Sequence, residues 1–355
     1  MNWLGNWRRR ATWVDYFLLA LRVAVVAVVA FGVANGLISQ KYSASDWTLF
    51  VTFGLTMGGM YALVALGYTM VFGILRMINM AHGDVMMLGA YGGMIVATAF
   101  AQSGFLVEMP VVAVPVIFMA SVAVSMASSL FVERIAARPF LHVRSLASFI
   151  CTLGLSIAIE YSVRGLFGTR NRAYPDIAWF DERVTVFGVT IPMAQVVAMA
   201  TAVVMMLILW LVVRYSALGR AMRAVSEDRD AAALVGIDVG RVIILTFAIG
   251  GAMAGVAGVL YGIVFKQIQV FLGFPMGIKA FAAAILGGIG NIPGAMFGGL
   301  LLGVAEAVGP ALLLDGLSIA APNQLRDIIS YGMLVLVLIF RPQGIFGERV
   351  AARRA

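Results

Sequence analysis

Nine long apolar segments take up most of this chain, and they constrain its fold more than any other feature of the sequence. They run at about 17–38, 48–75, 85–100, 111–132, 146–167, 193–213, 242–264, 280–309 and 327–340. A membrane-spanning helix needs roughly 20 consecutive apolar residues, so most of these segments are long enough to cross a bilayer. The sequence therefore predicts an all-α polytopic membrane protein.

The composition excludes a soluble protein. Hydrophobic residues make up 62% of the 355 residues and charged residues only 12%, whereas soluble domains carry about 25% charged residues. The net charge of +8 does not indicate nucleic-acid binding, because cytoplasmic loops of membrane proteins carry surplus Arg and Lys. The single cysteine, Cys151, excludes an internal disulfide and a cysteine-based metal cluster.

The basic residues predict the orientation of the helices. With a cytoplasmic N-terminus, sixteen Arg fall in inner segments and seven basic residues in outer segments, as the positive-inside rule requires. The outer seven are Lys41, Arg170, Arg172, Arg183, Lys266, Lys279 and Arg326. The triplet at 8–10 precedes the first apolar segment, which is longer than the apolar region of a signal peptide. We therefore expect an uncleaved helix there.

Nine complete crossings would place the basic C-terminus outside, so one segment must cross an even number of times. The segment at 280–309 contains the cluster Gly287–Gly294, with Pro293 inside it. The stretch from Lys279 to Gly288 spans only about 15 Å as helix, about half of a bilayer core. The sequence predicts about eight full transmembrane helices plus one re-entrant or broken helix pair at 280–309, with both termini cytoplasmic.

Stripes of small residues recur at four-residue spacing, which allows helices in a membrane to approach closely. One stripe comprises Gly250, Ala254, Gly258 and Gly262, and another comprises Gly54 and Gly58. A partial third stripe lies at Gly294 and Gly298. These stripes predict a tightly packed bundle.

No nucleotide-binding, metal-binding or catalytic motif is apparent. A P-loop needs Gly directly before Lys, but the three lysines follow Gln, Phe and Ile. His82 and His142 have no companion ligands at metal spacing. An intramembrane hydrolase using His82 and Asp84 would lack a nucleophile motif. We therefore predict no enzyme activity, no catalytic residue, no metal and no cofactor bound by this chain.

Polar residues within apolar segments are candidates for a substrate path, because their burial in a membrane is costly. The candidates are Asn79, His82, Asp84, Asn291 and Glu306. For His82 and Asp84 a second interpretation is a hydrogen-bonded turn near the inner interface, with Asp84 at a helix N-terminus. Glu160 and Arg164 are four residues apart, which predicts an ion pair within one helix.

The inner loop at 214–241 is charged and rich in alanine. A helix is expected after Ser226 as N-cap and before Gly236 as C-terminal residue. From the residues alone, this segment is either a solvated linker or a helix that docks into a cytoplasmic partner.

Several motifs in this order resemble a known family. Glu227 and Asp228, followed by Ala231, Ala232 and Gly236, resemble the coupling loop of bacterial ABC importer permeases. Three further stretches resemble the Liv-type permeases of branched-chain amino acid import: Gly54–Tyr68, Met77–Asp84 and Lys279–Ala295. The resemblance extends from about Trp47 to Gly347.

The resemblance implies a function and a set of partners. It implies a permease subunit that moves branched-chain amino acids across the bacterial inner membrane by alternating access. The implied partners are ABC ATPase subunits that use ATP, a second related permease and a periplasmic substrate-binding protein. Residues Glu227 to Gly236 are then the ATPase-docking segment.

The resemblance also sets the domain limits and leaves one alternative substrate open. A permease domain is expected at 47–348, with an additional helix and loop at 1–46 and a basic tail at 349–355. Permeases for urea or short amides share the turn at 79–83, so these solutes are the alternative substrates. The stretch Lys279–Ala295 is more similar to the amino-acid branch.

Overall fold

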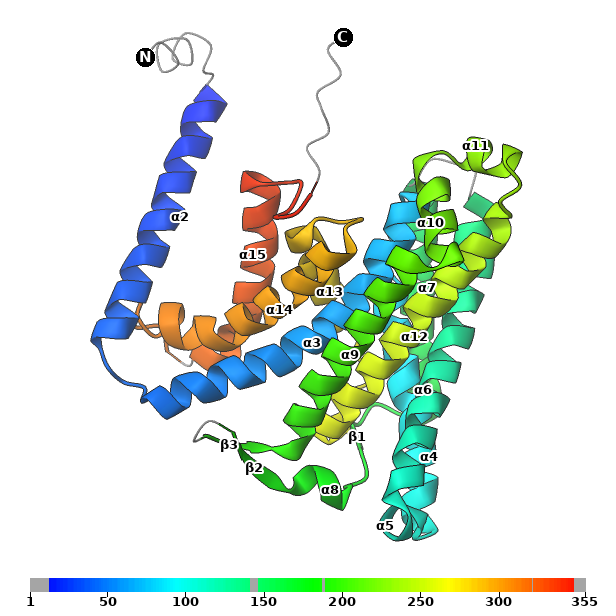
Figure 1. Cartoon of the computed structure of the whole chain (residues 1–355). Coiled ribbons are helices and arrows are strands. Elements are labelled where there is room, and N and C mark those ends of the chain that lie inside the picture. The colour runs from blue at the N-terminus through cyan, green and yellow to red at the C-terminus, as the bar shows by residue number, and fades with distance from the viewer. Residues whose placement is uncertain (1–12, 141–145, 187–188, 321, 348–355) are drawn as a thin grey trace.

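The computed structural model describes residues 13–140, 146–186, 189–320 and 322–347, which form an almost entirely helical bundle (Figure 1). Nine helical segments of this described part are long and apolar enough to cross a membrane. Their main helices are α2 (Trp13–Ile38), α3 (Ala44–Leu75), α4 (His82–Gln102), α6 (Pro110–Val132), α7 (Leu146–Phe167), α9 (Met193–Tyr215), α12 (Val239–Phe265), α14 (Ile292–Gly309) and α15 (Arg326–Phe340). Each of them overlaps a predicted apolar segment, so the predicted all-α membrane fold is confirmed.

Shorter elements connect and extend these helices. The short helices are α5 (Phe105–Glu108), α8 (Ala178–Asp181), α10 (Ala217–Glu227), α11 (Arg229–Leu234) and α13 (Gly273–Gly287). Further helical turns occupy Glu133–Ala137, Arg138–Phe140, Pro310–Leu314 (η3) and Pro322–Leu325 (η4). Strand β1 (Arg172–Ala173) pairs antiparallel with β4 (Gln267–Ile268), and β2 (Arg183–Val186) pairs antiparallel with β3 (Val189–Pro192).

The two ends of the bundle differ in the elements that they carry. The short helices α10 and α11 lie at one end, here called the inner end, and the hairpin β2–β3 with α5 and α8 lies at the outer end (Figure 1). The chain enters α2 and leaves α15 at the inner end (Figure 1). Both described ends of the chain therefore lie on one side, as the basic residues predicted.

The broken helix pair is present. Helix α13 ends at Gly287, where Gly288 adopts a φ of +107°, and α14 starts again at Ile292. Asn291 begins α14 by accepting a hydrogen bond from the N–H of Gly294 at 3.0 Å. Pro293 lies in the first turn of α14, where its missing N–H costs nothing. The Gly and Pro cluster therefore does break the helix, as its composition predicted.

The first arm of this pair is longer than the sequence predicted. Helix α13 begins at Gly273 rather than at 280, and its 15 residues span about 22 Å. The turn that follows is held by the segment after α15: the N–H groups of Ile345 and Phe346 donate to the carbonyls of Leu286 (2.8 Å) and Gly287 (3.0 Å). The turn thus lies beside the inner end of α15. A helical arm of ten residues, which the sequence predicted to end about halfway through the bilayer core, would be too short to reach it.

Helix α4 also begins inside the bundle. Helix α3 ends at Leu75, and the next residue, Arg76, has a φ of +54°. The chain then returns along α7, where the N–H of Met80 donates to Thr152 at 3.2 Å. A Cβ atom added to Gly250, in the middle of α12, would lie 3.6 Å from the His82 ring. The predicted position of this turn near the inner interface is therefore wrong.

Close contacts between small residues join the central helices. A Cβ atom added to Gly58 of α3 would lie 2.8 Å from the Cα of Leu300 in α14, and Gly303 contacts Gly58 from the other side. On α12, Gly255 lies against Ser121 and Val122 of α6, while Gly258 lies against Met86 and Ala90 of α4. The predicted stripes therefore lie at helix crossings, as lipid-embedded packing requires.

The α3–α14 crossing should tolerate no additional atom. Replacing Gly303 with Ala places a methyl group against the α3 backbone, and we expect a loss of about 1–3 kcal/mol in stability. The matched control is Gly154→Ala on α7, where a Cβ atom meets nothing within 4 Å. Thermal unfolding in detergent micelles measures both, and equal unfolding temperatures would contradict this packing.

The bundle polarity predicts the location of two loops. A topology reporter fused after Asp315 should read on the periplasmic side, because η3 follows α14 at its outer end. The same reporter placed after Val235, behind α11, should read in the cytoplasm. A cytoplasmic reading at Asp315 would rule out the broken pair as a return path through the membrane.

Candidate functional site

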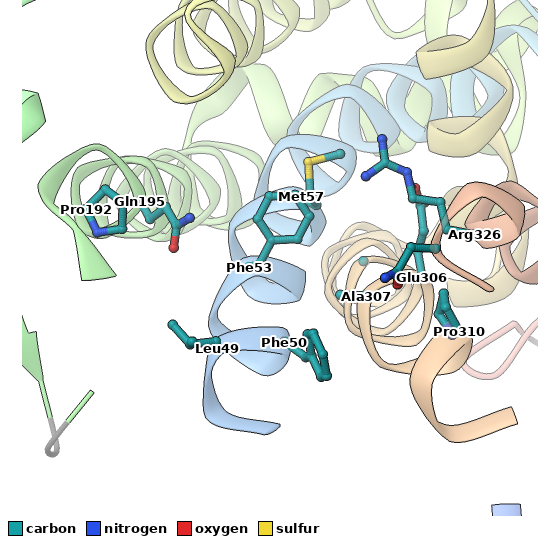
Figure 2. Close-up of a pocket in the computed structure, with 12 residues that line it drawn as sticks. Leu49, Phe50, Phe53, Met57, Pro192, Gln195, Glu306, Ala307, Pro310 and Arg326 are labelled. Atoms are coloured by element: carbon teal, nitrogen blue, oxygen red, sulfur yellow. The ribbon is translucent and has the colours of Figure 1, made fainter. Parts of the chain in front are cut away.

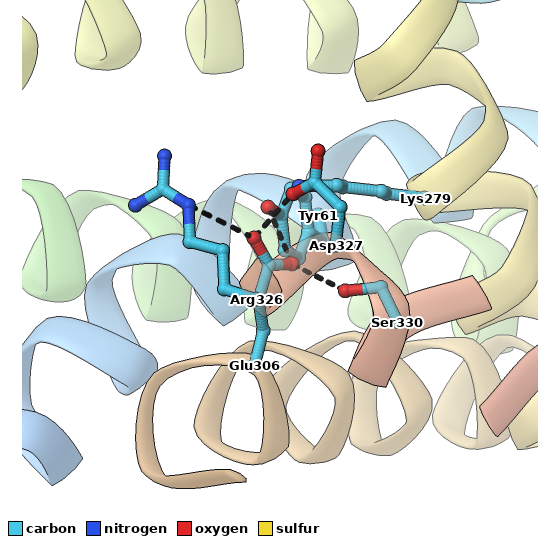
Figure 3. Close-up of polar contacts among 6 residues, drawn as sticks. All are labelled: Tyr61, Lys279, Glu306, Arg326, Asp327 and Ser330. Carbon is cyan, nitrogen blue, oxygen red and sulfur yellow. Dashed lines mark hydrogen bonds and ion pairs between the residues drawn. The ribbon is translucent and has the colours of Figure 1, made fainter. Parts of the chain in front are cut away.

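A buried ion network joins the four helices around the break (Figure 3). The ammonium of Lys279 on α13 lies 2.7 Å from Glu306 Oε1 on α14 and 2.8 Å from Asp327 Oδ1 on α15. The side chains of Lys279 and Glu306 are only 8% and 5% exposed. Lys279 was predicted in an outer segment, and this prediction is wrong, since the early start of α13 carries it into the bundle.

Hydrogen bonds complete the environment of Glu306. Its second oxygen, Oε2, accepts from Tyr61 on α3 at 2.9 Å and from Ser330 on α15 at 2.6 Å. The guanidinium of Arg326 approaches Oε1 at 4.0 Å. Two cations thus balance the two carboxylates of Glu306 and Asp327, as burial in a medium of low dielectric constant requires.

An open cavity adjoins this network on the outer half of the bundle (Figure 2). Its volume is about 360 Å³, within the usual range for small-molecule sites. Its wall comprises Leu49, Phe50, Phe53 and Met57 of α3, Pro192 and Gln195 beside α9, Gly303, Glu306, Ala307 and Pro310 along α14, and Asn323 and Arg326 before and at the start of α15. The cavity is apolar on α3 and charged where α14 meets α15.

Glu306 is the predicted path residue that lines this cavity. The other residues that give the cavity its character were not predicted as site residues, namely Arg326 and the apolar face of α3. Arg326 had been assigned to an outer segment, which agrees with its position at the outer start of α15. Its proximity to Glu306 depends on how α14 and α15 pack, and no local pattern in the sequence shows this.

His82, Asp84 and Asn79 lie in a separate, sealed region. His82 is 1%, Asp84 0% and Asn79 2% exposed. The His82 ring packs edge-on against Tyr68 with ring centroids 5.0 Å apart. Asp84 accepts a hydrogen bond from the Ser156 hydroxyl of α7. The sequence had offered a hydrogen-bonded turn as the alternative to a substrate path, with Asp84 at a helix N-terminus. Asp84 is indeed hydrogen-bonded and lies in the first turn of α4.

Two carboxylates converge on the N-terminus of α13. Glu160 accepts a hydrogen bond from the N–H of Phe274 at 3.2 Å, and Asp84 lies directly against Gly273. The Glu160 acceptor satisfies one of the unpaired N–H groups of this helix start. Arg164 lies over the rings of Phe271 (4.4 Å) and Tyr161 (5.2 Å). The structure therefore replaces the predicted Glu160–Arg164 pair with contacts between α7 and the start of α13.

Asn291 has a structural position. Besides capping α14, its side-chain amide donates to the carbonyl of Phe346 at 3.1 Å. It therefore fastens the turn of the broken pair to the chain after α15.

The charged inner loop folds as two short helices. Ser216 caps α10, and Gly219, Met222 and Val225 form its buried face. Asp228 caps α11 by accepting from the N–H groups of Asp230 (2.9 Å) and Ala231 (3.0 Å). The predicted cap at Ser226 is thus wrong, because Ser226 belongs to α10 and donates to the Arg223 carbonyl. Gly236 follows the end of α11 with a φ of +87°.

Two arginines attach this loop to the bundle. Arg223 donates to the carbonyl of Val213 at 2.6 Å, and Arg229 donates to the carbonyl of Ile74 at 3.0 Å, at the inner end of α3. Desolvation by burial lowers the pKa of Arg229. Of the predicted coupling residues, Glu227, Asp228, Ala231 and Gly236 are exposed and Ala232 is buried. Leu234 and Val235 expose 88% and 77% of their surface.

An ion cluster fastens the loop between α7 and α9 to the outer end of α12. Lys266 lies 2.8 Å from Asp176 and also pairs with Asp181. The hydrogen bond to Asp176, together with that to Asp181, raises the pKa of Lys266 above its ordinary value. These exposed groups contribute little to stability, but they cover the end of α12.

Buried charges inside an apolar bundle, an outer cavity and a tethered inner loop define a class of protein, the membrane transport permease. A family model described as "Branched-chain amino acid transport system / permease component" matches residues 50–338. The chain belongs to this family, whose members are transport components and not enzymes.

Curated relatives agree with this assignment. The high-affinity branched-chain amino acid transport system permease protein LivH of Salmonella typhimurium is 42% identical over 298 residues, covering 83% of this chain and 94% of that protein. LivH of Escherichia coli is 41% identical with the same coverage. The corresponding protein BraD of Pseudomonas aeruginosa is 43% identical over 299 residues, again 83% of this chain and 94% of that protein.

The ion network should make Lys279 essential for stability. The change Lys279→Met leaves the buried carboxylate of Glu306 without its main cation, and we expect a loss of about 3–5 kcal/mol. Lys41, which pairs with Asp315 while 57% exposed, is the matched control, and Lys41→Met should change little. Unfolding of both variants in detergent tests this, and a small effect for both would show that the network is not buried.

Proposed function

We propose that this chain is the membrane-spanning permease subunit of an ATP-driven importer that moves branched-chain amino acids across the cell inner membrane. The observation that carries the proposal is its 41–43% identity to the LivH and BraD permeases, which extends over 94% of their length. Identity at this level across a whole membrane domain supports a shared substrate class. The proposal favours branched-chain amino acids over urea and short amides.

Energy for transport would come from partner subunits. The chain itself carries no P-loop sequence, so ATP would be used by two ATPase subunits at the inner face. A second related permease would complete the membrane part, and a periplasmic binding protein would deliver the amino acid. No cofactor is proposed for this chain.

The helices α10 and α11 would form the ATPase-docking surface. They project at the inner end (Figure 1), and they combine exposed acidic groups, Glu227 and Asp228, with the exposed apolar pair Leu234 and Val235. Exposed large apolar side chains next to charges are typical of a docking surface. The bond from Arg229 to the Ile74 carbonyl connects this surface to α3.

Helix α3 would transmit movement of this surface to the outer cavity. It runs from Ile74, beneath α11, to Met57, Phe53 and Leu49 in the cavity wall. It also contacts the ion network through Tyr61. A displacement at the inner end of a packed helix is passed along its length, because helix interfaces do not deform continuously. This continuity supports alternating access of the cavity.

The proposed permease domain is 47–348, and the family match at 50–338 falls inside it. Helix α2 precedes the match and contacts the bundle mainly at η3, where Gly32 and Gly36 lie against Leu313 and Leu312. We assign residues 1–46 to an additional membrane helix and its loop. The proposed basic tail at 349–355 lies outside the described residues.

The docking surface is tested by reversing one charge on it. Glu227→Lys should reduce ATP-dependent uptake of labelled leucine to below about a tenth of the wild-type rate, since opposed charges in an interface are replaced by like charges. Gly236→Asp should have the same effect, and because Gly236 has a φ of +87°, where an Asp strains the backbone, the unfolding temperature of this variant is measured beside its uptake. Uptake is measured in right-side-out or reconstituted vesicles that contain the complete transporter.

The matched control is Glu108→Lys, an exposed residue at the outer end of the bundle. It should leave uptake unchanged. Wild-type uptake in the Glu227→Lys and Gly236→Asp variants would exclude a docking role for α10 and α11. Uptake of urea without uptake of leucine in the wild type would exclude the proposed substrate class.

A further inference from the structure

Arg326 is the charged residue of the outer cavity whose N–H donors have no hydrogen-bond partner among the described residues. Within the described part of the chain it makes no hydrogen bond, and its contact with Glu306 is a 4.0 Å approach of Nε. Its side chain is 46% exposed. Figure 2 shows its guanidinium turned toward Met57 and Phe53, and Figure 3 shows it extending away from the network. A guanidinium has five N–H donors, so most donors of Arg326 face the cavity unpaired.

Lys279 differs from Arg326 in this respect. Its ammonium is held between Glu306 and Asp327, and its side chain is 8% exposed. The Glu306 carboxylate is likewise occupied by Lys279, Tyr61 and Ser330. The network therefore forms a fixed base, and Arg326 is the cation on this base that an anionic ligand can reach.

The opposite wall of the cavity is apolar and regular. Leu49, Phe53 and Met57 follow each other at four-residue spacing on one face of α3. Gly303 and Ala307 of α14 line the cavity beside this face, where Gly303 packs against the α3 backbone. An aliphatic side chain of moderate size would contact the aromatic ring and the thioether without meeting a buried polar group.

We propose that this cavity binds the substrate amino acid on the outer half of its path, with Arg326 pairing with the α-carboxylate and the α3 face of Phe53 and Met57 holding the aliphatic side chain. This assignment rests on the proposed function, and it names the site at which the transported amino acid first binds to the permease. A planar guanidinium forms two parallel hydrogen bonds with a carboxylate. The amides of Gln195 and Asn323, also in the wall, supply oxygen acceptors for the α-ammonium group.

The charges of the network already cancel without a ligand, because the carboxylates of Glu306 and Asp327 balance Lys279 and Arg326. A zwitterionic amino acid fits such a site, since it adds no net charge to the cavity. A neutral urea or amide would leave the Arg326 donors only weakly engaged, because charge-assisted hydrogen bonds are about twice as strong as neutral ones. The cavity therefore selects for a carboxylate next to an apolar group.

Competition binding to the complete transporter in lipid nanodiscs, without the binding protein, tests this site. Labelled L-leucine is displaced by unlabelled L-leucine, by L-leucinol, which lacks the carboxylate, or by 4-methylpentanoate, which lacks the ammonium group. For the wild type we expect leucinol to compete at least about tenfold more weakly than leucine, since it loses the charge-assisted bonds. We expect 4-methylpentanoate to compete better than leucinol.

The variants assign this preference to one residue. Arg326→Gln should weaken leucine binding at least about tenfold and remove the difference between leucine and leucinol, while Arg326→Lys should keep part of it. Arg170→Gln, an exposed arginine on the same side, is the matched control. Unfolding temperatures close to that of the control show that Arg326→Gln is folded, as the weak 4.0 Å contact with Glu306 leads us to expect.

Two results would overturn the site alone. In one, Arg326→Gln binds leucine and leucinol as the Arg170→Gln control does. In the other, the wild-type transporter binds no leucine, although it takes up leucine with ATP and binding protein. A complete transporter that takes up no leucine at all would overturn the proposed function and the site with it.

Discussion

The constraint on which this structure depends is that buried ammonium groups and helix starts inside an apolar bundle need partners of complementary charge or hydrogen-bonding capacity. Lys279 crosses from α13 to Glu306 of α14 at 2.7 Å and to Asp327 of α15 at 2.8 Å. Tyr61 attaches α3 to the same carboxylate. One neutral network thus joins two arms of a broken helix to the helices on both sides. Without it, α13 would place a cation among apolar side chains at a cost of several kcal/mol.

The same constraint explains the breaks in the backbone. Each interior helix start needs acceptors for its N–H groups. Glu160 of α7 accepts from Phe274 at the start of α13, and Asn291, the N-cap of α14, accepts from Gly294 of its own helix. Broken helices are tolerated at membrane depth only where protein surrounds them. Around α13 this is the case, and the arrangement leaves an open cavity on the outer side of the network, with α10 and α11 at the inner end of the bundle. Helix α3 contacts both.

Most of the fold could be predicted from the sequence, but the site could be predicted only in part. Apolar segments of the length of α3 or α12 have one stable form in lipid, and Gly288 with Pro293 marks the break. The start of α13 was missed because Gly273, Pro275 and Gly277 are typical of a turn. The Lys279–Glu306 pair joins residues on two arms of the break, so it depends on packing that no local pattern shows. Arg326 was placed correctly outside, but its cavity forms only when α3, α14 and α15 meet.

Amide hydrogen exchange along α13 tests this account most directly. In this account the Lys279 network, together with Glu160 and Asp84 at the start of α13, keeps this half-helix inside the bundle. The amides of 276–287 should then exchange as slowly as those of α12 in nanodisc-embedded protein. They should exchange far more slowly than the amides of α11, which lies exposed at the inner end. Exchange of α13 at the rate of α11 would contradict the account, because the broken pair would then open to water without first breaking the network.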